Sequence, residues 1–511
     1  MRTGIFFVIV PALAAFTVAG IANPQDTQPV EVYPAVTIGG GVLSLDLPQD
    51  IKAVDKVNKV EIRPVKLDGG YVVVVSDSTY KDAEWSKVVH AISYKYSAEI
   101  LVYTGQVTSV KDELSKRMPR YTCFIAKPEE ANEQYVLDVL RMSRKLDDDI
   151  YMDTFSGILT GYSVRDALRI ASCSEPLVVH KALSAAYTIP VENLEEVTRY
   201  NESKKNCSEV KGKDGVVKAV SCPDDLAKEL VDGLNDGQPD MFVTSGHSSE
   251  DNWLIGYKYN AGEFRCKNGV LYGMDTNQNI YAVNSPNPKV YLAPGNCLIG
   301  HIKNKQSMAL AYMGSCGVNQ MAAYLSLTDQ GFSGWGTYYY FVCQPGRFNL
   351  VESWYLSKQL LISKLENRMP GANAYEIKQY RTTSADKIAS DLGFSEVNPD
   401  VMWIIKLIVD RDIFVLYGDP AWDARLVTRN LYWEQSLTEK DGVYTFEVKG
   451  IKDSSCKRPP SAIFPERLKN IKILEGQGLN PVIADDFLIL PDINKIEKDK
   501  TYKVVFKAEK A

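Results

Sequence analysis

The chain has 511 residues, and its 58 basic and 64 acidic side chains give a net charge of −6 at pH 7. Its apolar fraction of 45% and charged fraction of 24% are ordinary for a globular protein, which disfavours disordered, collagen-like and multi-span membrane proteins. The length allows two or three domains. Because charges of both signs are distributed along the chain, we expect no nucleic-acid partner.

The amino terminus has the pattern of a secretory signal. Arg2 precedes the apolar run IFFVIVPALAAFTVAGIA, which ends in small residues at Gly20 and Ala22. An uncleaved membrane anchor is the alternative, because a bilayer span needs about 20 apolar residues. Pro11 and the small residues favour cleavage, so we expect residues 1–22 to be a signal peptide. The mature protein would then be secreted, periplasmic or at the cell surface, in an oligomeric state that the sequence leaves open.

Export also affects the interpretation of the nine cysteines. In an oxidising compartment an even set is expected to form disulfides, and one thiol would be left over. Cys207 with Cys222, and Cys266 with Cys297, are candidate local pairs because each pair brackets a loop that contains Gly. The chain has no CxxC or CxxH spacing, which argues against a zinc site.

The predicted elements begin after a polar segment, residues 23–69, which is either an N-terminal extension or a removable pro-segment. From Gly70 onward, strands alternate with helices. The predicted strands are GGYVVVVSD, AEILVYTG and RYTCFIAKP, and the predicted helices are EWSKVVHAISYKY, VTSVKDELSKRM and NEQYVLDVLRMSRKL. This alternation predicts an α/β domain with a mostly parallel sheet and two subdomains over residues 70–429.

The alternation resumes with the helix DDLAKELVDGLN and the strands PDMFVTSGH and SMALAYMGSC. The long segment between those two strands, residues 252–306, is rich in Asn, Gly, Pro and Tyr. Segments of that size are usually functional or carry small elements of their own. From residue 430 short strands follow one another without helical periodicity, which predicts a C-terminal β-sandwich of immunoglobulin-like size over residues 430–511.

Two of the predicted strands end in reactive side chains, His247 and Cys316. Because open α/β sheets place their chemistry at the carboxyl ends of strands, a His and a Cys there could form a nucleophilic dyad. Gly246 and Gly314 shortly before them would allow a sharp turn or a close approach of substrate. Cys316 could also be half of a disulfide or a buried thiol in the core.

These residues resemble the gingipain family of cysteine peptidases, which has a caspase-like fold. GHSSEDNW at 246–253 is similar to the family's His motif, GSCGVN at 314–319 to its Cys motif, and IFVLYGDPAWDARL at 413–426 to its closing segment. The resemblance implies Cys316 as nucleophile and His247 as general acid/base. It also implies supporting or oxyanion roles at Gly246, Glu250 and Gly314, and pocket roles for Trp253 and Asp149. The chain departs from the family pattern at Ser248, Ser315 and Gly317.

The function implied by the resemblance is a secreted cysteine endopeptidase that cleaves peptide bonds through a thioester intermediate. Its substrates would be proteins or peptides, with association to a cell surface as a further expectation. No cofactor is required, and calcium is expected only as a structural ion. Two alternatives stay open: a cell-surface sorting transpeptidase with the same dyad, and a catalytically inactive adhesion or scaffold protein.

Overall fold

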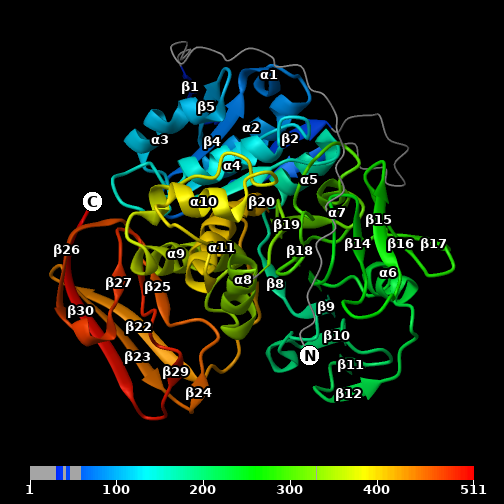
Figure 1. The fold of residues 1–511 in the computed structure, drawn as a ribbon. Coiled ribbons are helices and arrows are strands. Elements are labelled where there is room, and N and C mark those ends of the chain that lie inside the picture. Colours follow the sequence, from blue (N-terminus) through cyan, green and yellow to red (C-terminus); the bar gives the residue numbers. More distant parts are fainter. Residues whose placement is uncertain (1–29, 38–41, 47–58, 330) are drawn as a thin grey trace.

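The computed structural model describes residues 30–37, 42–46, 59–329 and 331–511 (Figure 1). A large, mostly parallel sheet flanked by helices forms the main body, and antiparallel strands form a separate C-terminal unit (Figure 1). The predicted signal peptide, residues 1–22, lies outside the described residues. Among the described residues, no helix combines the length and apolarity that a bilayer crossing requires.

The first half of the sheet confirms the predicted alternation of strands and helices. Its strands lie in the order β1-β5-β4-β6-β7, and all neighbours except the edge strand β1 pair in parallel. The valine run of β4 is buried, as expected for a strand covered on both faces. The elements are β1 (Glu31–Tyr33), β4 (Tyr71–Ser76), α1 (Asp77–Tyr80), α2 (Trp85–Tyr96), β5 (Glu99–Tyr103), η1 (Val107–Val110), α3 (Lys111–Arg117), β6 (Tyr121–Ile125), α4 (Glu133–Met142), β7 (Phe155–Leu159) and α5 (Val164–Ser172).

The second half continues the same sheet in the order β20-β19-β18-β13-β9-β10-β11-β12. The two halves meet where β7 pairs with β20, and Gly157 permits this contact because a Cβ there would lie 2.6 Å from the Gly418 carbonyl oxygen. The strands are β9 (Lys181–Ala185), β10 (Glu196–Tyr200), β11 (Ser208–Lys211), β12 (Val217–Val220), β13 (Met241–Thr244), β18 (Lys289–Leu292), β19 (Val318–Tyr324) and β20 (Phe414–Gly418).

The helices of this half are α6 (Ala227–Asn235), α7 (Met308–Met313), α8 (Phe332–Cys343), α9 (Leu350–Arg368), η2 (Val191–Asn193), η3 (Ala372–Ala374), α10 (Ala385–Asp391) and α11 (Pro399–Ile413). Two small sheets accompany the main one. One pairs β8 (Leu177–Val179) with β21 (Ala424–Leu426), and the other joins β14 (Asn252–Leu254), β15 (Glu263–Lys267), β16 (Val270–Met274) and β17 (Ile280–Ala282). The long segment 252–306 therefore carries elements of its own, as predicted.

The strand predicted at SMALAYMGSC is wrong. Residues 308–313 form the buried helix α7, and the strand β19 begins after Cys316 rather than ending at it. Met, Ala and Leu are strong helix formers, and a short apolar run does not reveal its own periodicity. Gly317, at φ +71°, then turns the chain into β19.

The C-terminal unit contains the predicted antiparallel strands around its own apolar core, which includes Phe446, Phe464 and Phe506. One sheet has the order β22-β23-β30-β26, a second β25-β28-β27, and a third pairs β24 with β29. Its elements are β22 (Trp433–Lys440), β23 (Val443–Gly450), β24 (Ser454–Ser455), β25 (Ser461–Ile463), β26 (Leu468–Glu475), η4 (Gln477–Leu479), β27 (Val482–Ile483), β28 (Phe487–Ile489), β29 (Lys495–Ile496) and β30 (Thr501–Lys510). Its likeness to an immunoglobulin module stays a prediction.

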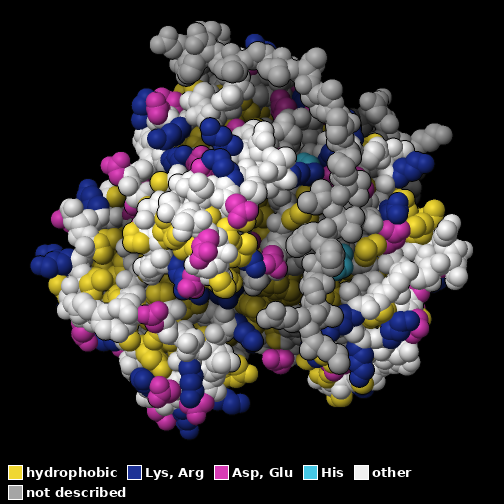
Figure 2. Space-filling model, viewed as in Figure 1, with side chains coloured by type: hydrophobic (Ala, Val, Ile, Leu, Met, Phe, Trp, Pro, Cys, Tyr) yellow, Lys and Arg dark blue, Asp and Glu magenta, His cyan; other side chains and the backbone are white. Residues whose placement is uncertain are grey.

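The predicted amino-terminal extension is partly described. Its segment β1 adds an antiparallel edge strand to β5, and β2 (Leu43–Asp46) pairs with β3 (Lys59–Ile62). Whether this extension is removed as a pro-segment stays a prediction. On the face of the molecule shown in Figure 2, basic and acidic side chains are interspersed, in keeping with the balanced composition.

The expected disulfides are absent. All nine cysteines lie within the described part of the chain, and each carries a free thiol. The proposed partners Cys266 and Cys297 are engaged elsewhere: the Cys266 thiol donates to the Gln306 carbonyl (2.8 Å), and the Cys297 sulfur contacts the backbone of Thr328. Cys207 and Cys222, which flank the hairpin of β11 and β12, are likewise unpaired.

Candidate active site

His247 lies where the sequence predicts it, just beyond the carboxyl end of β13. The four residues of β13 are buried, and the chain then turns at Gly246, whose φ of +111° is a conformation that side-chain-bearing residues rarely adopt. The His247 carbonyl accepts the Leu254 N–H (2.9 Å), and its exposed ring stacks on Tyr257 with 5.0 Å between centroids. The imidazole is therefore held at the surface by its backbone and by one aromatic neighbour.

A second reactive side chain, Cys297, lies beyond the carboxyl end of the neighbouring strand. β18 ends at Leu292, and Pro294 lacks the N–H needed to extend the ladder. Cys297 is partly exposed, and its sulfur lies 3.4 Å from both the backbone N and the carbonyl O of Thr328, which follows β19. Leu298, at φ +60°, places a tight turn directly after the thiol.

The strand register brings this cysteine and His247 to one edge. β13 and β18 are parallel, with Val243 opposite Leu292, so His247 and Cys297 follow the same level of the sheet by four and five residues. Both line one cavity of about 420 Å³. Its other walls include Gly246 and Gly295, the aromatic rings of Tyr257 and Trp335, and the carboxylates of Glu202 and Asp329.

Hydrogen bonds hold the two loops together. The buried Asn296 accepts from the Thr244 hydroxyl (2.8 Å) and donates to the Gly246 carbonyl (3.2 Å). From the other loop, the Ser248 hydroxyl donates to the Cys297 carbonyl (2.7 Å). Asn296 and Ser248 thus fix the position of the His247 backbone relative to the Cys297 backbone.

Glu250, predicted to support the site, lies buried in the same loop as His247, and side chains from two other segments surround its carboxylate. Its Oε1 lies 3.7 Å from His301 Nδ1, 3.6 Å from Lys303 Nζ and 3.7 Å from Arg381 Nη1. Burial alone would raise the pKa of Glu250, but a backbone hydrogen bond and the positive charges of Arg381 and Lys303 hold it below its usual value. Because His301 belongs to the Cys297 loop, Glu250 makes one more connection between the two loops.

Trp253 and Asp149, the predicted pocket residues, lie outside the cavity at His247. Trp253 is buried, stacks on Phe264 and donates from Nε1 to the Ser245 carbonyl (2.9 Å), so it supports the turn before His247 from beneath. Asp149 lies after α4, with ligand atoms of Asp147 and Asp485 within 4.8 Å. Partial removal from water raises the pKa of Asp149 to about 6, and the neighbouring carboxylates add to this rise.

The carboxylates of Asp147, Asp149 and Asp485 are hard oxygen donors of the kind that calcium prefers, and they are close enough to share one ion. However, Arg467 already forms an ion pair with Asp485, which offsets part of the negative charge. The three residues would be the ones to hold a structural calcium ion. Calcium binding stays a prediction.

Cys316 does not lie near His247. β18 and β19 are parallel with Lys289 opposite Val318, so Cys316 lies before the amino end of β19. Val318 is level with Lys289 and Thr244 is level with residue 293, four residue steps further along β18, or roughly 13 Å along the strands. The structure therefore separates the predicted dyad to opposite edges of the sheet.

The surroundings of Cys316 are those of a structural thiol. Its side chain is completely buried, and its carbonyl accepts from Lys289 Nζ (2.6 Å). Burial raises the pKa of the Cys316 thiol, although Lys289 and Arg169 act in the opposite direction. Gly314 serves packing here, since a Cβ would lie 2.6 Å from the Gly269 carbonyl oxygen. The predicted roles of Cys316 as nucleophile and of Gly314 as its support are not retained.

The sequence contained a signal for Cys297 that the prediction missed. KVYL is a short apolar run with two β-formers, and it ends at Ala-Pro-Gly before Asn296 and Cys297. A strand, then turn-forming residues, then a reactive side chain is also the order at His247, where the strand MFVT is followed by Ser245 and Gly246. The signal for Cys297 was obscured because the run lies inside the long polar segment and because Cys297 was assigned to a disulfide.

Comparisons with known proteins do not identify the chain. No protein-family model matches it, and the search of curated proteins finds no similar sequence. A solved structure described as "Structure of Protease" covers 86% of this chain and 97% of its own, with 10% identity and a TM-score of 0.36. A likeness this low carries no argument for a shared fold or activity. The gingipain resemblance stays a prediction, and its cysteine motif is weakened because Cys316 precedes a strand instead of following one.

Proposed function

We propose that the protein is a cysteine peptidase whose nucleophile is Cys297 and whose general acid/base is His247. The observation that carries this proposal is their position: they follow neighbouring parallel strands and line the same cavity. Cysteine catalysis needs a thiol that substrate can reach and an imidazole at the same edge to accept its proton. Cys297 and His247 meet both conditions, whereas Cys316 meets neither.

The proposed reaction proceeds in two halves. His247 takes the proton of Cys297, the thiolate attacks the scissile carbonyl carbon, and the protonated imidazole then gives that proton to the leaving amine. A water molecule, deprotonated by His247, attacks the thioester, and the collapse of this second intermediate returns the proton to the sulfur. Backbone N–H groups at the rim, at Gly246 and Cys297, are the candidate donors to the oxyanion.

Polar groups of the backbone surround the sulfur. The Thr328 N–H is directed at Cys297 Sγ, and the Thr328 carbonyl accepts from the same thiol, both at 3.4 Å. In addition, α8 begins at the cavity, since its N-terminal capping residue Gly331 lines the wall. These contacts hold the thiol at the cavity that His247 also lines.

Chemical modification tests this proposal directly. Iodoacetamide applied to the folded protein should modify Cys297, abolish cleavage of fluorescently labelled casein, and be slowed by excess casein. Peptide mapping by mass spectrometry identifies the modified thiol. Complete modification of Cys297 with undiminished cleavage would overturn the assignment, as would the absence of any thiol-dependent cleavage.

The acceptor of the acyl group can be determined in the same assay. With glycine methyl ester present, an enzyme that transfers to amines yields products heavier by the added amine, whereas a hydrolase yields free carboxylates. We expect the hydrolytic products to dominate. A majority of amine-linked products would favour the transpeptidase alternative while leaving the Cys297–His247 pair intact. Secretion and cell-surface association are expectations about the same enzyme, and they rest on residues 1–22.

A further inference from the structure

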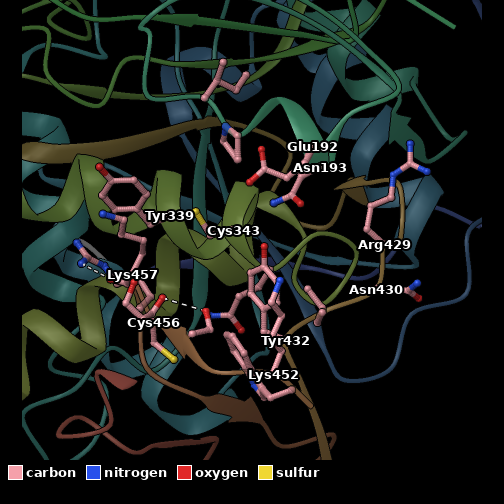
Figure 3. A pocket seen from close by; sticks show the side chains of 18 of the residues that line it. Glu192, Asn193, Tyr339, Cys343, Arg429, Asn430, Tyr432, Lys452, Cys456 and Lys457 are labelled. Carbon is pink, nitrogen blue, oxygen red and sulfur yellow. Dashed lines mark hydrogen bonds between the residues drawn. The ribbon is translucent and has the colours of Figure 1, made fainter. Parts of the chain in front are cut away.

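A larger cavity, of about 950 Å³, lies between the main α/β body and the C-terminal β unit (Figure 3). The α/β body contributes the 188–193 segment and the end of α8. The linker 429–433 and the 452–458 segment of the C-terminal unit close the other side. The proposed mechanism does not use this cavity.

Cations predominate in the wall of this cavity. Five basic side chains line it against two acidic ones, Glu192 and Asp453. Arg199 is neutralised by Glu209, and Arg429 lies 3.6 Å from Glu195. The remaining three, Lys452, Lys457 and Arg458, form no ion pair with any carboxylate among the described residues.

Aromatic rings rather than carboxylates hold these three cations in place. Lys452 Nζ lies 5.5 Å from the centroid of Tyr432, and Lys457 Nζ lies 5.7 Å from that of Tyr339. Figure 3 shows Lys457 beside Tyr339 and Lys452 beside Tyr432. Arg458 packs over Phe332 and Tyr339. Cations positioned in this way keep their charge available to a ligand.

Two walls connect this cavity to the one at Cys297. Along α8, Trp335 lines the smaller cavity, while Tyr339 and Cys343 line the larger one, and the Trp335 and Tyr339 rings stack at 5.9 Å. On the opposite side, Glu202 of the smaller cavity accepts the N–H of Tyr187 (2.8 Å), which leads directly into the 188–193 segment. The two cavities are therefore bordered by the same two parts of the chain.

We propose that the larger cavity is a subsite for an acidic segment of the peptide whose scissile bond lies at Cys297. This inference rests on the proposed function. Trp335 and Cys343 are eight residues apart on α8, which corresponds to about 12 Å, the span of about four residues of extended peptide. Asp or Glu side chains about four to six residues from the cut, on one side, would reach Lys452, Lys457 and Arg458.

Binding tests the subsite without requiring catalysis. The probes are fluorescein-labelled Gly-Glu-Gly-Glu-Gly-Glu-Gly and its Gln counterpart, titrated by fluorescence anisotropy into the Cys297→Ala protein. We expect the Glu peptide to bind at least about tenfold more tightly than the Gln peptide, and added salt to weaken the difference. Equal affinity for the two peptides would overturn the proposal.

Charge-removing variants locate the binding. Lys452→Gln/Lys457→Gln removes two exposed cations and should weaken binding of the Glu peptide by about tenfold or more. Lys472→Gln, on the exposed β26, removes a similar charge outside the cavity and serves as the matched control. Equal weakening by the control would overturn the assignment of the site. Arg458→Gln is a secondary variant, because that side chain also donates to the Phe332 carbonyl and contributes to packing.

Cleavage-site profiling separates the two proposals. Peptides cleaved from a proteome digest should be enriched in Asp or Glu four to six residues from the cut, and the double variant should lose this enrichment. For a substrate with such an acidic segment, the double variant should show a raised KM and little change in kcat. Cleavage without enrichment would leave the peptidase proposal standing and overturn the subsite. Tight binding of the Glu peptide by a protein without peptidase activity would overturn the peptidase proposal and leave an acidic-peptide site in the larger cavity.

Discussion

The two edges of the sheet formed by β13, β18 and β19 differ in their surroundings. A cysteine lies at each edge, just outside the strands. At the carboxyl edge, Cys297 is partly exposed, lines a cavity with His247 and receives the Thr328 N–H. At the amino edge, Cys316 is completely buried, and the cations Lys289 and Arg169 surround it. The same three strands thus present one thiol to solvent and enclose the other.

The difference lies in what the polar groups at each edge are used for. At the amino edge, Lys289 and Arg169 direct their donors at backbone carbonyls and at the side-chain oxygens of Asn287 and Asn319, and the Cys316 thiol has no access to solvent. At the carboxyl edge, Asn296 and Ser248 connect the two loops to each other and leave the His247 ring and the cavity accessible. Position relative to strand direction, rather than the local sequence around a cysteine, separates the two roles.

The largest effect should come from replacing each of the two cysteines with alanine in separate variants. Cys297→Ala should lower kcat/KM for peptide hydrolysis by at least about 10³-fold, because the nucleophile is lost. Cys316→Ala should leave kcat/KM within about threefold and only reduce the free energy of unfolding, by about 1–3 kcal/mol, because it leaves a small cavity in the core. Both variants are compared by initial rates after folding is verified by circular dichroism.

The reverse pattern, inactivity of Cys316→Ala with an active Cys297→Ala, would restore the prediction from the gingipain motif. It would mean that the amino edge opens in solution to admit substrate.

The second prediction concerns the stability of the amino edge. Arg169 donates to the carbonyls of Met313 (2.5 Å), Gly317 (3.2 Å) and Val318 (3.0 Å). Arg169→Met removes these donors and should lower the free energy of unfolding by about 3–5 kcal/mol, measured by urea denaturation. Arg165→Met, on the same helix α5, should cost less than about 0.5 kcal/mol. Similar losses in both variants would contradict a structural role for the Arg169 contacts.

Much of this fold could be predicted from residue patterns. The valine run of β4 and the periodic helices of the first half were correctly located, as was the antiparallel C-terminal unit. His247 was also correctly placed, because MFVT is an unambiguous strand and a glycine follows it closely. In each case local propensity, periodicity and turn chemistry agree.

The errors came from places where local signals disagree or tertiary structure decides. MALAYM is too short and too uniformly apolar to show whether it is a helix or a strand, and that choice moved Cys316 from one edge of the sheet to the other. The disulfide expectation then assigned Cys297 to Cys266, although spacing alone cannot establish which cysteines meet. The network of Glu250, His301 and Arg381 joins distant segments, so no local pattern could have predicted it.

The third prediction concerns the pH dependence of folding stability, to which the carboxyl edge contributes through His301. His301 lies buried in the Cys297 loop, faces Arg381, Lys303, Glu250 and Asp251, and has its pKa lowered to about 4, mainly by burial. Between pH 6.5 and 4 the unfolded chain therefore binds the proton more readily than the folded one. The stability contribution is present above pH 6.5 and is lost as the pH falls toward 4, by at most about 3 kcal/mol.

His301→Gln should flatten this part of the stability profile. Urea denaturation at a series of pH values from 4 to 7 measures the effect, and the wild-type protein should lose about 1–3 kcal/mol more than the variant over this range. Parallel profiles for the two proteins would show that His301 protonates equally well in the folded and unfolded states.

The smallest effect is expected from the hydrogen bonds that align the two loops. Asn296→Ala removes the donor to the Gly246 carbonyl and the acceptor of the Thr244 hydroxyl, so the His247 and Cys297 loops lose their buried connection. We expect kcat to fall about tenfold with KM nearly unchanged, because misalignment affects the chemical step more than substrate binding. Asn296→Asp keeps the acceptor and loses the donor, so its kcat should lie between those of Asn296→Ala and the wild type. Ser248→Ala, which removes only the bond to the Cys297 carbonyl, should lower kcat by no more than about threefold. Initial rates are measured for each variant and normalised to the folded fraction. If Asn296→Ala then keeps the wild-type kcat, Asn296 stabilises the carboxyl edge without positioning its reactive groups.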